Sequence, residues 1–360
     1  MTLADIFRRF ANEYLNKYKK NILPSHVKVI DAIINCRTDI MGGQIWFCQS
    51  CEKYHYSYHS CKDRHCPQCG NNASDLWLEK QNKLLLPAIY FMATFTVPEP
   101  LRYFIRSHQK LMYNILFQTS AKALQTLAQD KRFIGGTIGM TGVLHTWTRD
   151  LNYHPHIHYL IPGGGLRADL RKWRRCKSDF LMHVKPLSII YRDLFKTAVR
   201  KAGLYNQIPT SVWKQEWVVN IIPVGNGEST LKYLAPYICR VAISNRNIIS
   251  IDDKNVTFRY KKSGEGHFTY LKLNAMEFMR RFLQHVLPKG FIKVRYYGLF
   301  SPRKKGLLTI AKKLLGVLLS KISGKEKLSR QMLCPECNGL MIFLNEIKHY
   351  RGPPILQKVI

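Results

Sequence analysis

The sequence predicts an α+β protein whose central domain is a mainly antiparallel sheet with a split βαβ layout. Two observations carry this prediction. Between residues 88 and 244, segments typical of strands and helices follow one another in the order strand, helix, strand, strand, helix, strand, helix. A short polar turn joins the two middle strands, so they should form a hairpin. Two strand–helix–strand halves joined by a hairpin give the split βαβ arrangement.

Each element follows from its residue pattern. Residues 88–98 are rich in aromatic and β-branched side chains, as expected of a buried strand. Apolar residues recur near a 3.6-residue period over residues 101–129, which predicts a long helix. Further strands are expected at 136–147, 153–162 and 216–225, and further helices at 73–86, 187–203 and 229–244.

The composition indicates a polyanionic partner. The 360 residues include 56 lysines and arginines against 23 aspartates and glutamates, a formal net charge of +33. Nucleic acid is the first expectation for so basic a chain, and an anionic membrane surface is the second. Lysine or arginine interrupts every long apolar stretch, so we expect no membrane span. The N-terminus has the pattern of an amphipathic helix and no signal peptide, which predicts a cytoplasmic protein.

A cysteine-rich segment indicates a structural zinc site. Cys48–Cys51 and Cys66–Cys69 each have the two-residue gap of a zinc knuckle, and fourteen residues separate the pairs. In a reducing compartment, cysteines at this spacing predict metal ligation rather than disulfides. We expect these four thiolates to hold one Zn²⁺.

Other candidate zinc ligands complicate this count. Cys61 and His65 lie inside the loop, and either could replace a member of the quartet; packing or DNA contact is the alternative for both. A second pair, Cys334–Cys337, stands alone near the C-terminus, with His349 as a candidate third ligand and no fourth. This pair is weak support for a second site.

Four regions follow from these patterns. Residues 1–87 are expected to form a helical, zinc-binding and DNA-binding domain, and residues 88–245 the central α+β domain. Residues 246–300 are expected to form a β-hairpin and helix extension, and residues 301–360 a basic tail that carries the lone cysteine pair.

Three histidines recur at every second position of one expected strand. His154, His156 and His158 would share a face, because side chains two residues apart in a strand point the same way. A polar surface strand and a metal site are both compatible with this spacing.

Two tyrosines follow later in the chain. Tyr233 and Tyr237 would share a face of an uninterrupted helix, and such pairs are usually packing residues. Pro236 makes the helix geometry less regular, because proline lacks the amide donor.

Taken together, these elements resemble the two-tyrosine HUH transposases of the insertion-sequence ninety-one family. The resemblance is carried by the histidine strand, the two tyrosines and the preceding zinc segment. It is clearest over residues 145–165, 231–248 and 277–299, and it extends from about residue 10 to residue 305.

The resemblance implies a ferredoxin-like nuclease core that nicks and rejoins single-stranded DNA by a rolling-circle-like route. His156 and His158 would bind a catalytic Mg²⁺ or Mn²⁺. Tyr233 and Tyr237 would be the nucleophiles that form 5′-phosphotyrosine intermediates. Strand transfer of this kind conserves the bond energy in the adduct, and the sequence contains no P-loop for ATP.

Two histidines leave the metal short of protein ligands, and geometry suggests a third. If the hairpin loop has four residues, Thr148 faces Tyr153 and His145 faces His156. His145 would then border the metal, with His154 as the rival ligand. A loop longer by one residue would turn His145 to the other face.

The expected DNA contacts lie in basic stretches that also contain aromatic rings, a mixture that suits a single strand. A solvated basic loop is the alternative for each stretch. The candidate residues are Arg171, Trp173, Arg174, Arg175, Arg240 and Arg295.

Three rival functions remain at this point. A plasmid replication initiator or relaxase would use the same nicking chemistry, and a noncatalytic zinc-finger regulator would use none. The zinc segment favours the transposase, which we expect to act on single-stranded or locally melted DNA at the bacterial nucleoid. An acidic-triad transposase is disfavoured by the scarcity of aspartate and glutamate. The oligomeric state cannot be read from the sequence.

Overall fold

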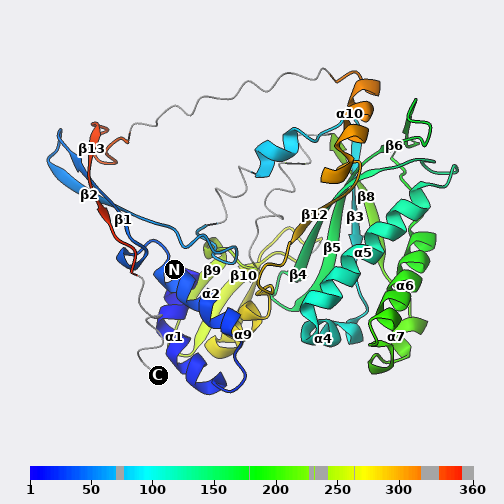
Figure 1. The fold of residues 1–360 in the computed structure, drawn as a ribbon. Coiled ribbons are helices and arrows are strands. Elements are labelled where there is room, and N and C mark those ends of the chain that lie inside the picture. The colour runs from blue at the N-terminus through cyan, green and yellow to red at the C-terminus, as the bar shows by residue number, and fades with distance from the viewer. Residues whose placement is uncertain are drawn as a thin grey trace.

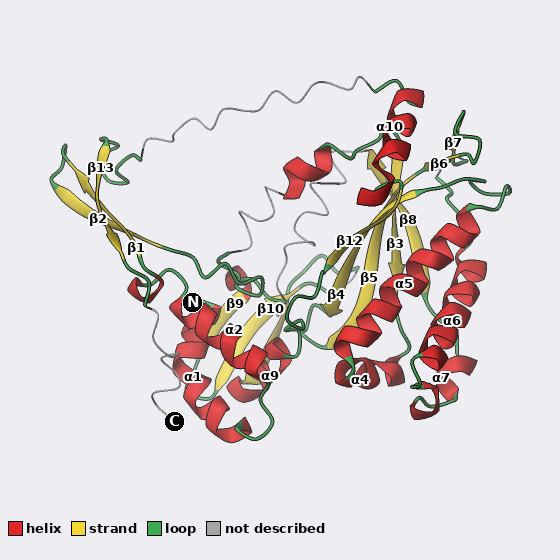
Figure 2. Cartoon of the chain, in the orientation of Figure 1, coloured by secondary structure: helices red, strands yellow, loops and turns green. Residues whose placement is uncertain are grey.

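The computed structural model describes residues 1–69, 77–177, 179–226, 231, 242–262, 264–317 and 332–350. Three bodies of secondary structure are visible within these ranges (Figure 1). They are a five-stranded sheet with helices, a helical body that contains a small sheet, and a three-stranded sheet. The last of these projects from the helical body (Figure 2).

The central sheet has five strands in the order β12-β4-β5-β3-β8, and every neighbouring pair is antiparallel. The strands are β3 (Ile89–Phe95), β4 (Gly139–Trp147), β5 (Tyr153–Pro162), β8 (Val219–Asn226) and β12 (Val294–Gly298). Four of them have the predicted split βαβ order, which confirms the predicted α+β class. The fifth, β12, lies in the region expected to be a separate extension, so the predicted boundary at residue 245 does not end this domain.

Helices cover one face of this sheet (Figure 1). They are α4 (Glu99–Ser107), α5 (Gln109–Ala128), α6 (Val184–Lys201) and the short α7 (Ser211–Lys214). The long helix predicted over 101–129 is two helices, because His108 has φ −121° and ψ 39° and interrupts the helical backbone.

Alternation along β5 sorts its side chains between the two faces of the sheet. Ile157, Tyr159 and Ile161 are fully buried against the helices. Leu160 belongs to a smaller cluster on the other face, with Tyr90 among its members. Because side chains alternate in a strand, His156 and His158 lie on the face away from α5 and α6.

A second core joins the N-terminal helices to the region after residue 247. Its elements are α1 (Leu3–Tyr18), α2 (Pro24–Asn35), β9 (Ile248–Ile251), β10 (Asn255–Tyr260), β11 (Thr269–Asn274) and α9 (Ala275–Leu283). Phe7 of α1 packs edge-on against Phe282 of α9, with ring centroids 5.5 Å apart. The expectation that residues 1–87 and 246–300 form separate regions is therefore wrong, because their apolar faces cover each other.

The C-terminal segment returns to the N-terminal hairpin (Figure 1). Strand β13 (Met341–Ile347) pairs antiparallel with β1 (Gly43–Cys48), which pairs in turn with β2 (Lys53–Tyr58). Residues 341–347 are therefore part of the projecting sheet and not of an independent tail.

The remaining elements are short. A hairpin is formed by β6 (Gly164–Leu166) and β7 (Trp173–Arg175), and the amphipathic α10 (Lys305–Leu314) buries Leu308 and Ala311 in a cluster that includes Leu166. Single 3-10 turns lie at Asp39–Met41, Tyr205–Gln207, Asn245–Asn247 and Pro302–Lys304. Within the described part of the chain, no helix is long and apolar enough to cross a bilayer.

The turn between β4 and β5 connects the two large cores. Leu151 in this turn has a left-handed φ of 66°, and its side chain is fully buried in the core of α1, α2 and α9. Its carbonyl accepts hydrogen bonds from Gln284 Nε2 at 2.9 Å and from His285 Nε2 at 3.2 Å. The hairpin that carries the histidines is thereby fixed at its tip.

We predict that Leu151→Ala lowers the free energy of unfolding by about 2–5 kcal/mol, because it removes a buried side chain and leaves a cavity. Leu170→Ala is the matched control, since Leu170 also has a left-handed φ, of 58°, but its side chain is 40% exposed. The control should change stability by less than about 0.5 kcal/mol. Urea denaturation measures both, and equal effects would contradict the docking role of Leu151.

Candidate active site

Strands β4 and β5 bring three histidines together. His145 of β4 lies directly opposite His156 of β5, as predicted. The route to this pairing differs from the prediction, because Trp147 and not Thr148 lies opposite Tyr153, and the register shifts between His145 and Trp147. Without this shift, Leu144 would face His156. The irregularity therefore returns His145 to the face that carries the other imidazoles.

The three rings form a compact group. One ring nitrogen from each of His145, His156 and His158 lies within 4.8 Å of the others. The ring centroids of His156 and His158 are 4.8 Å apart, and that of His145 is 4.9 Å from His158. His154 lies outside this group, although its ring centroid is 5.1 Å from that of His156.

Hydrogen bonds orient two of the rings. His156 Nδ1 is 2.7 Å from the carbonyl oxygen of His154, and His158 Nδ1 is 2.9 Å from Thr94 Oγ1 on β3. A carbonyl can only accept, so Nδ1 of His156 carries the proton and Nε2 keeps its lone pair. Thr94 plays the same orienting role for His158 when its hydroxyl accepts. Thr94 could not be predicted from local patterns, because its place opposite His158 depends on the strand order.

Burial keeps these imidazoles neutral. It lowers the pKa of His156 to about 4 and the pKa of His158 to about 3, with smaller contributions from neighbouring positive charge. Neutral imidazole is the form that binds a metal, so protons do not compete for the nitrogens near pH 7. Three convergent imidazoles, of which His156 and His158 are neutral and oriented by hydrogen bonds, fit a divalent cation whose remaining ligands are oxygens of water or phosphate.

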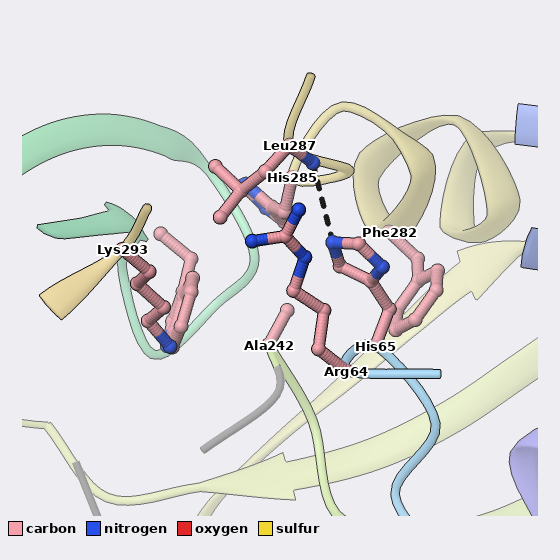
Figure 3. A pocket seen from close by; sticks show the side chains of 8 residues that line it. Arg64, His65, Ala242, Phe282, His285, Leu287 and Lys293 are labelled. Atoms are coloured by element: carbon pink, nitrogen blue, oxygen red, sulfur yellow. Dashed lines mark hydrogen bonds between the residues drawn. The ribbon is translucent and has the colours of Figure 1, made fainter. Parts of the chain in front are cut away.

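A pocket lies beside the histidine group. Trp147 stacks on the His145 ring at 5.0 Å, and Lys293 Nζ lies 5.0 Å from the Trp147 ring centroid. Figure 3 shows Arg64, His65 and Lys293 around this pocket. Arg64 Nη1 donates to the Phe291 carbonyl at 2.6 Å. The full lining is Arg64, His65, Trp147, Ala242, Phe282, His285, Leu287 and Lys293.

His65 docks the cysteine-rich loop at this pocket. Its Nε2 accepts from the Leu287 amide at 3.2 Å (Figure 3), which leaves Nδ1 as a donor to Asp63 Oδ1 at 2.9 Å. Both ring nitrogens are thus engaged, and His65 is a packing residue and not a zinc ligand.

The cysteines form two groups of four and not the predicted quartet. Cys36, Cys61, Cys66 and Cys69 make one group, and Cys48, Cys51, Cys334 and Cys337 make the other. The prediction that Cys48, Cys51, Cys66 and Cys69 share one Zn²⁺ is therefore wrong in its pairing. Each predicted knuckle finds a different partner, and the pair near the C-terminus does not stand alone.

Comparison with known proteins gives the family. A model described as "Putative transposase" matches residues 139–306, and one described as "Transposase zinc-binding domain" matches residues 6–97. The chain is 35% identical to "Putative transposase y4qJ" of Sinorhizobium fredii, over 98% of this chain and 97% of that protein. The chain belongs to the IS91 family of transposases. This transposase is also 26% identical to "Transposase for insertion sequence element IS801" of Pseudomonas savastanoi pv. phaseolicola, over 78% of this chain and 71% of that protein.

No solved structure matches the transposase. Its family makes it a DNA-binding enzyme with a zinc-binding domain. The group of Cys36, Cys61, Cys66 and Cys69 lies entirely within the matched zinc-binding domain.

The predicted nucleophiles of the transposase, Tyr233 and Tyr237, lie outside the described residues, as does Arg240. Described residues on either side of them are close to the histidine group. Leu231 is buried in the cluster of Tyr90 and Leu160 on the histidine face, and Ala242 lines the pocket beside Trp147.

The other predicted DNA contacts differ in position. Arg171 and Arg175 are exposed, whereas Trp173 and Arg174 are half-buried in or beside the β6–β7 hairpin. Arg295 lies on the helix-covered side of the sheet. Its guanidinium is 4.3 Å from the Phe117 ring centroid, and it donates to Asn114 Oδ1 at 2.5 Å. Arg295 is thus a packing residue on the face away from the histidines, which corrects the prediction.

We predict that alanine at His145, His156 or His158 weakens Mn²⁺ binding at least about tenfold, because each change removes one nitrogen of the group. His154→Ala is the control, since alanine keeps the carbonyl that orients His156. It should bind Mn²⁺ within about threefold of the unaltered protein.

Titration followed by electron paramagnetic resonance of free Mn²⁺ measures these affinities. Thr94→Val should weaken Mn²⁺ binding about 10–100-fold, because it removes the hydrogen bond to His158. Equal affinities for His145→Ala and His154→Ala would contradict the assignment of the third ligand.

Proposed function

We propose that this transposase nicks and rejoins single-stranded or locally melted DNA through 5′-phosphotyrosine intermediates, as a two-tyrosine HUH enzyme of rolling-circle type. His145, His156 and His158 hold the catalytic divalent cation, Mg²⁺ or Mn²⁺, and Tyr233 and Tyr237 are the nucleophiles. The convergence of the three imidazoles on one face of the sheet is the observation that carries this proposal.

Chain connectivity supports the assignment of the two tyrosines as nucleophiles. Leu231 belongs to the same buried cluster as Leu160, which is two residues from His158 on the same face of β5 and so about 7 Å along the strand. Tyr233 follows Leu231 by two residues, a distance that the backbone spans in at most about 7 Å. The length of chain after Leu231 therefore allows Tyr233 to reach a phosphate bound at the histidine group.

The reaction exchanges one phosphodiester for another. When bound, the cation withdraws charge from the non-bridging phosphate oxygens and so lowers the repulsion of an incoming nucleophile. The phenol oxygen of a tyrosine loses its proton to solvent and forms the bond to phosphorus. The bond from phosphorus to the 3′-oxygen breaks, and that oxygen leaves with the electron pair and takes up a proton. The DNA retains a free 3′-hydroxyl, and its 5′-phosphate is linked to the protein.

Rejoining is the reverse of this step. A 3′-hydroxyl attacks the phosphotyrosine, the tyrosine oxygen leaves, and no nucleotide cofactor is required. The second tyrosine can cleave the next strand while the first remains attached. Two nucleophiles thus allow successive transfers within one complex.

Cationic and aromatic residues around the histidines suit a DNA strand. The pocket beside His145 combines the Trp147 ring with Lys293, a mixture that favours stacked bases and nearby phosphates. Arg102 of α4 is close enough to His154 and His156 to lower the pKa of both imidazoles.

We predict that the protein, a labelled single-stranded oligonucleotide spanning an element end, and Mn²⁺ give a DNA adduct that survives denaturing gel electrophoresis. Tyr233→Phe together with Tyr237→Phe should abolish the adduct, because both nucleophilic oxygens are lost. Each single substitution shows which tyrosine attacks first.

Tyr270→Phe is the control, since Tyr270 is 60% exposed on β11 in the other body. It should leave the adduct yield unchanged. An adduct that persists in the double variant would contradict the assignment of the nucleophiles. DNA binding without any adduct would favour a noncatalytic regulator.

A further inference from the structure

We infer that this transposase binds a second structural zinc ion, in a site that joins its N-terminal hairpin to its C-terminal segment. The ligands are Cys48 and Cys51, at the β1–β2 turn, with Cys334 and Cys337, which precede β13. Two of these four residues lie outside both regions matched by the family models, so the matched zinc-binding domain does not account for the site.

The sulfur positions fit one tetrahedral ion. Cys48 Sγ is 3.4 Å from Cys337 Sγ, and Cys51 Sγ is 3.6 Å from Cys334 Sγ. A disulfide would bring two sulfurs to about 2.05 Å. Four thiolates about 2.3 Å from one zinc lie about 3.8 Å apart, close to the observed separations. All four cysteines are free thiols.

Backbone amides hydrogen-bond to the first sulfur of each cysteine pair in the same way. The amides of Ser50 and Cys51 hydrogen-bond to the Cys48 sulfur. The amides two and three residues after Cys334, those of Glu336 and Cys337, hydrogen-bond to its sulfur in the same manner. Amide donors stabilise the thiolate, which is the form that binds zinc. The two segments thus have one local geometry, although their sequences lie far apart.

Strained backbone follows each pair at the equivalent position. Glu52, after Cys51, has φ 55°, and Asn338, after Cys337, has φ 58°. Residues other than glycine seldom adopt this conformation unless the surroundings require it. The two pairs also approach closely, because a Cβ on Gly339 would lie 2.3 Å from Ser50 Oγ. These features are independent of the sulfur positions and point to the same paired knuckles.

The site links the N-terminal hairpin to the C-terminal segment. The sulfur contacts join residues 283 and 289 positions apart, and β13 pairs with β1 next to them. Lys53 and Glu336 form an ion pair across the same junction. Most side chains of β2 and β13 are half-exposed or exposed, so this sheet has little core of its own. Metal binding therefore supplies much of the free energy that holds β13 in place.

The decisive experiment counts zinc per chain in the full-length protein. His156→Ala serves as the background, so that the histidine group does not add to the count. Mass spectrometry of the metal should give two zinc ions per chain. The pair Cys334→Ser and Cys337→Ser should give one, and Cys61→Ser with Cys69→Ser should also give one. Cys176→Ser, a cysteine outside both groups, should leave two.

Two further readouts complement the count, and the first of them requires no cysteine variant. X-ray absorption at the zinc edge of the background protein should show a shell of four sulfurs at about 2.3 Å. Hydrogen exchange should be slow in β1 and should become fast when Cys334 and Cys337 are serine. One zinc per chain in the background protein, or a shell with fewer than four sulfurs on average, would overturn the inference. Two zinc ions in the variant that lacks both C-terminal thiols would do the same.

Discussion

The pairing of His145 with His156 across the β4–β5 hairpin is the contact on which the proposed metal site depends. The shift in register between His145 and Trp147 decides which face of β4 the imidazole occupies. With that face fixed, three imidazole nitrogens converge where no helix of the α5–α6 layer covers the sheet. Leu151 at the tip of the hairpin is anchored in the other core, so the strands that carry the ligands cannot slide without disturbing a second body. The position of the site is therefore held by the packing of Leu151 in the other core.

Contacts between distant segments organise the whole transposase. The N-terminal helices share a core with α9, β12 completes the sheet that begins with β3, and the last described strand pairs with the first. The cysteine-rich loop is part of this closure, because His65 accepts from the Leu287 amide while Cys66 belongs to the first sulfur group. A zinc-binding loop thus lines the same pocket as Trp147, beside the histidines. The zinc-binding loop and the histidine-bearing sheet are thus connected directly through this pocket.

Local patterns predicted the elements well and their partners less well. Alternating histidines gave the shared face of His156 and His158, which depends only on neighbouring residues. Hairpin geometry predicted the pairing of His145 with His156 but missed the register shift that produces it. The pairing of cysteine knuckles failed, since a two-residue gap fixes each knuckle but carries no information about its partner 283 residues away. The place of β12 and the packing of Arg295 on Phe117 depend equally on distant contacts. Thr94 became visible only once β3 and β5 were seen to be neighbours.

The most direct test of the account is a count of the imidazoles bound to the catalytic cation. Pulsed electron paramagnetic resonance of Mn²⁺ in the protein detects each coordinated nitrogen by its magnetic coupling, and ¹⁵N-labelled histidine identifies those nitrogens as imidazole. The structure predicts couplings from three histidine nitrogens, and the loss of one of them in His145→Ala. A bound Mn²⁺ with no histidine coupling would contradict the account, because the ion would then lie elsewhere on the chain.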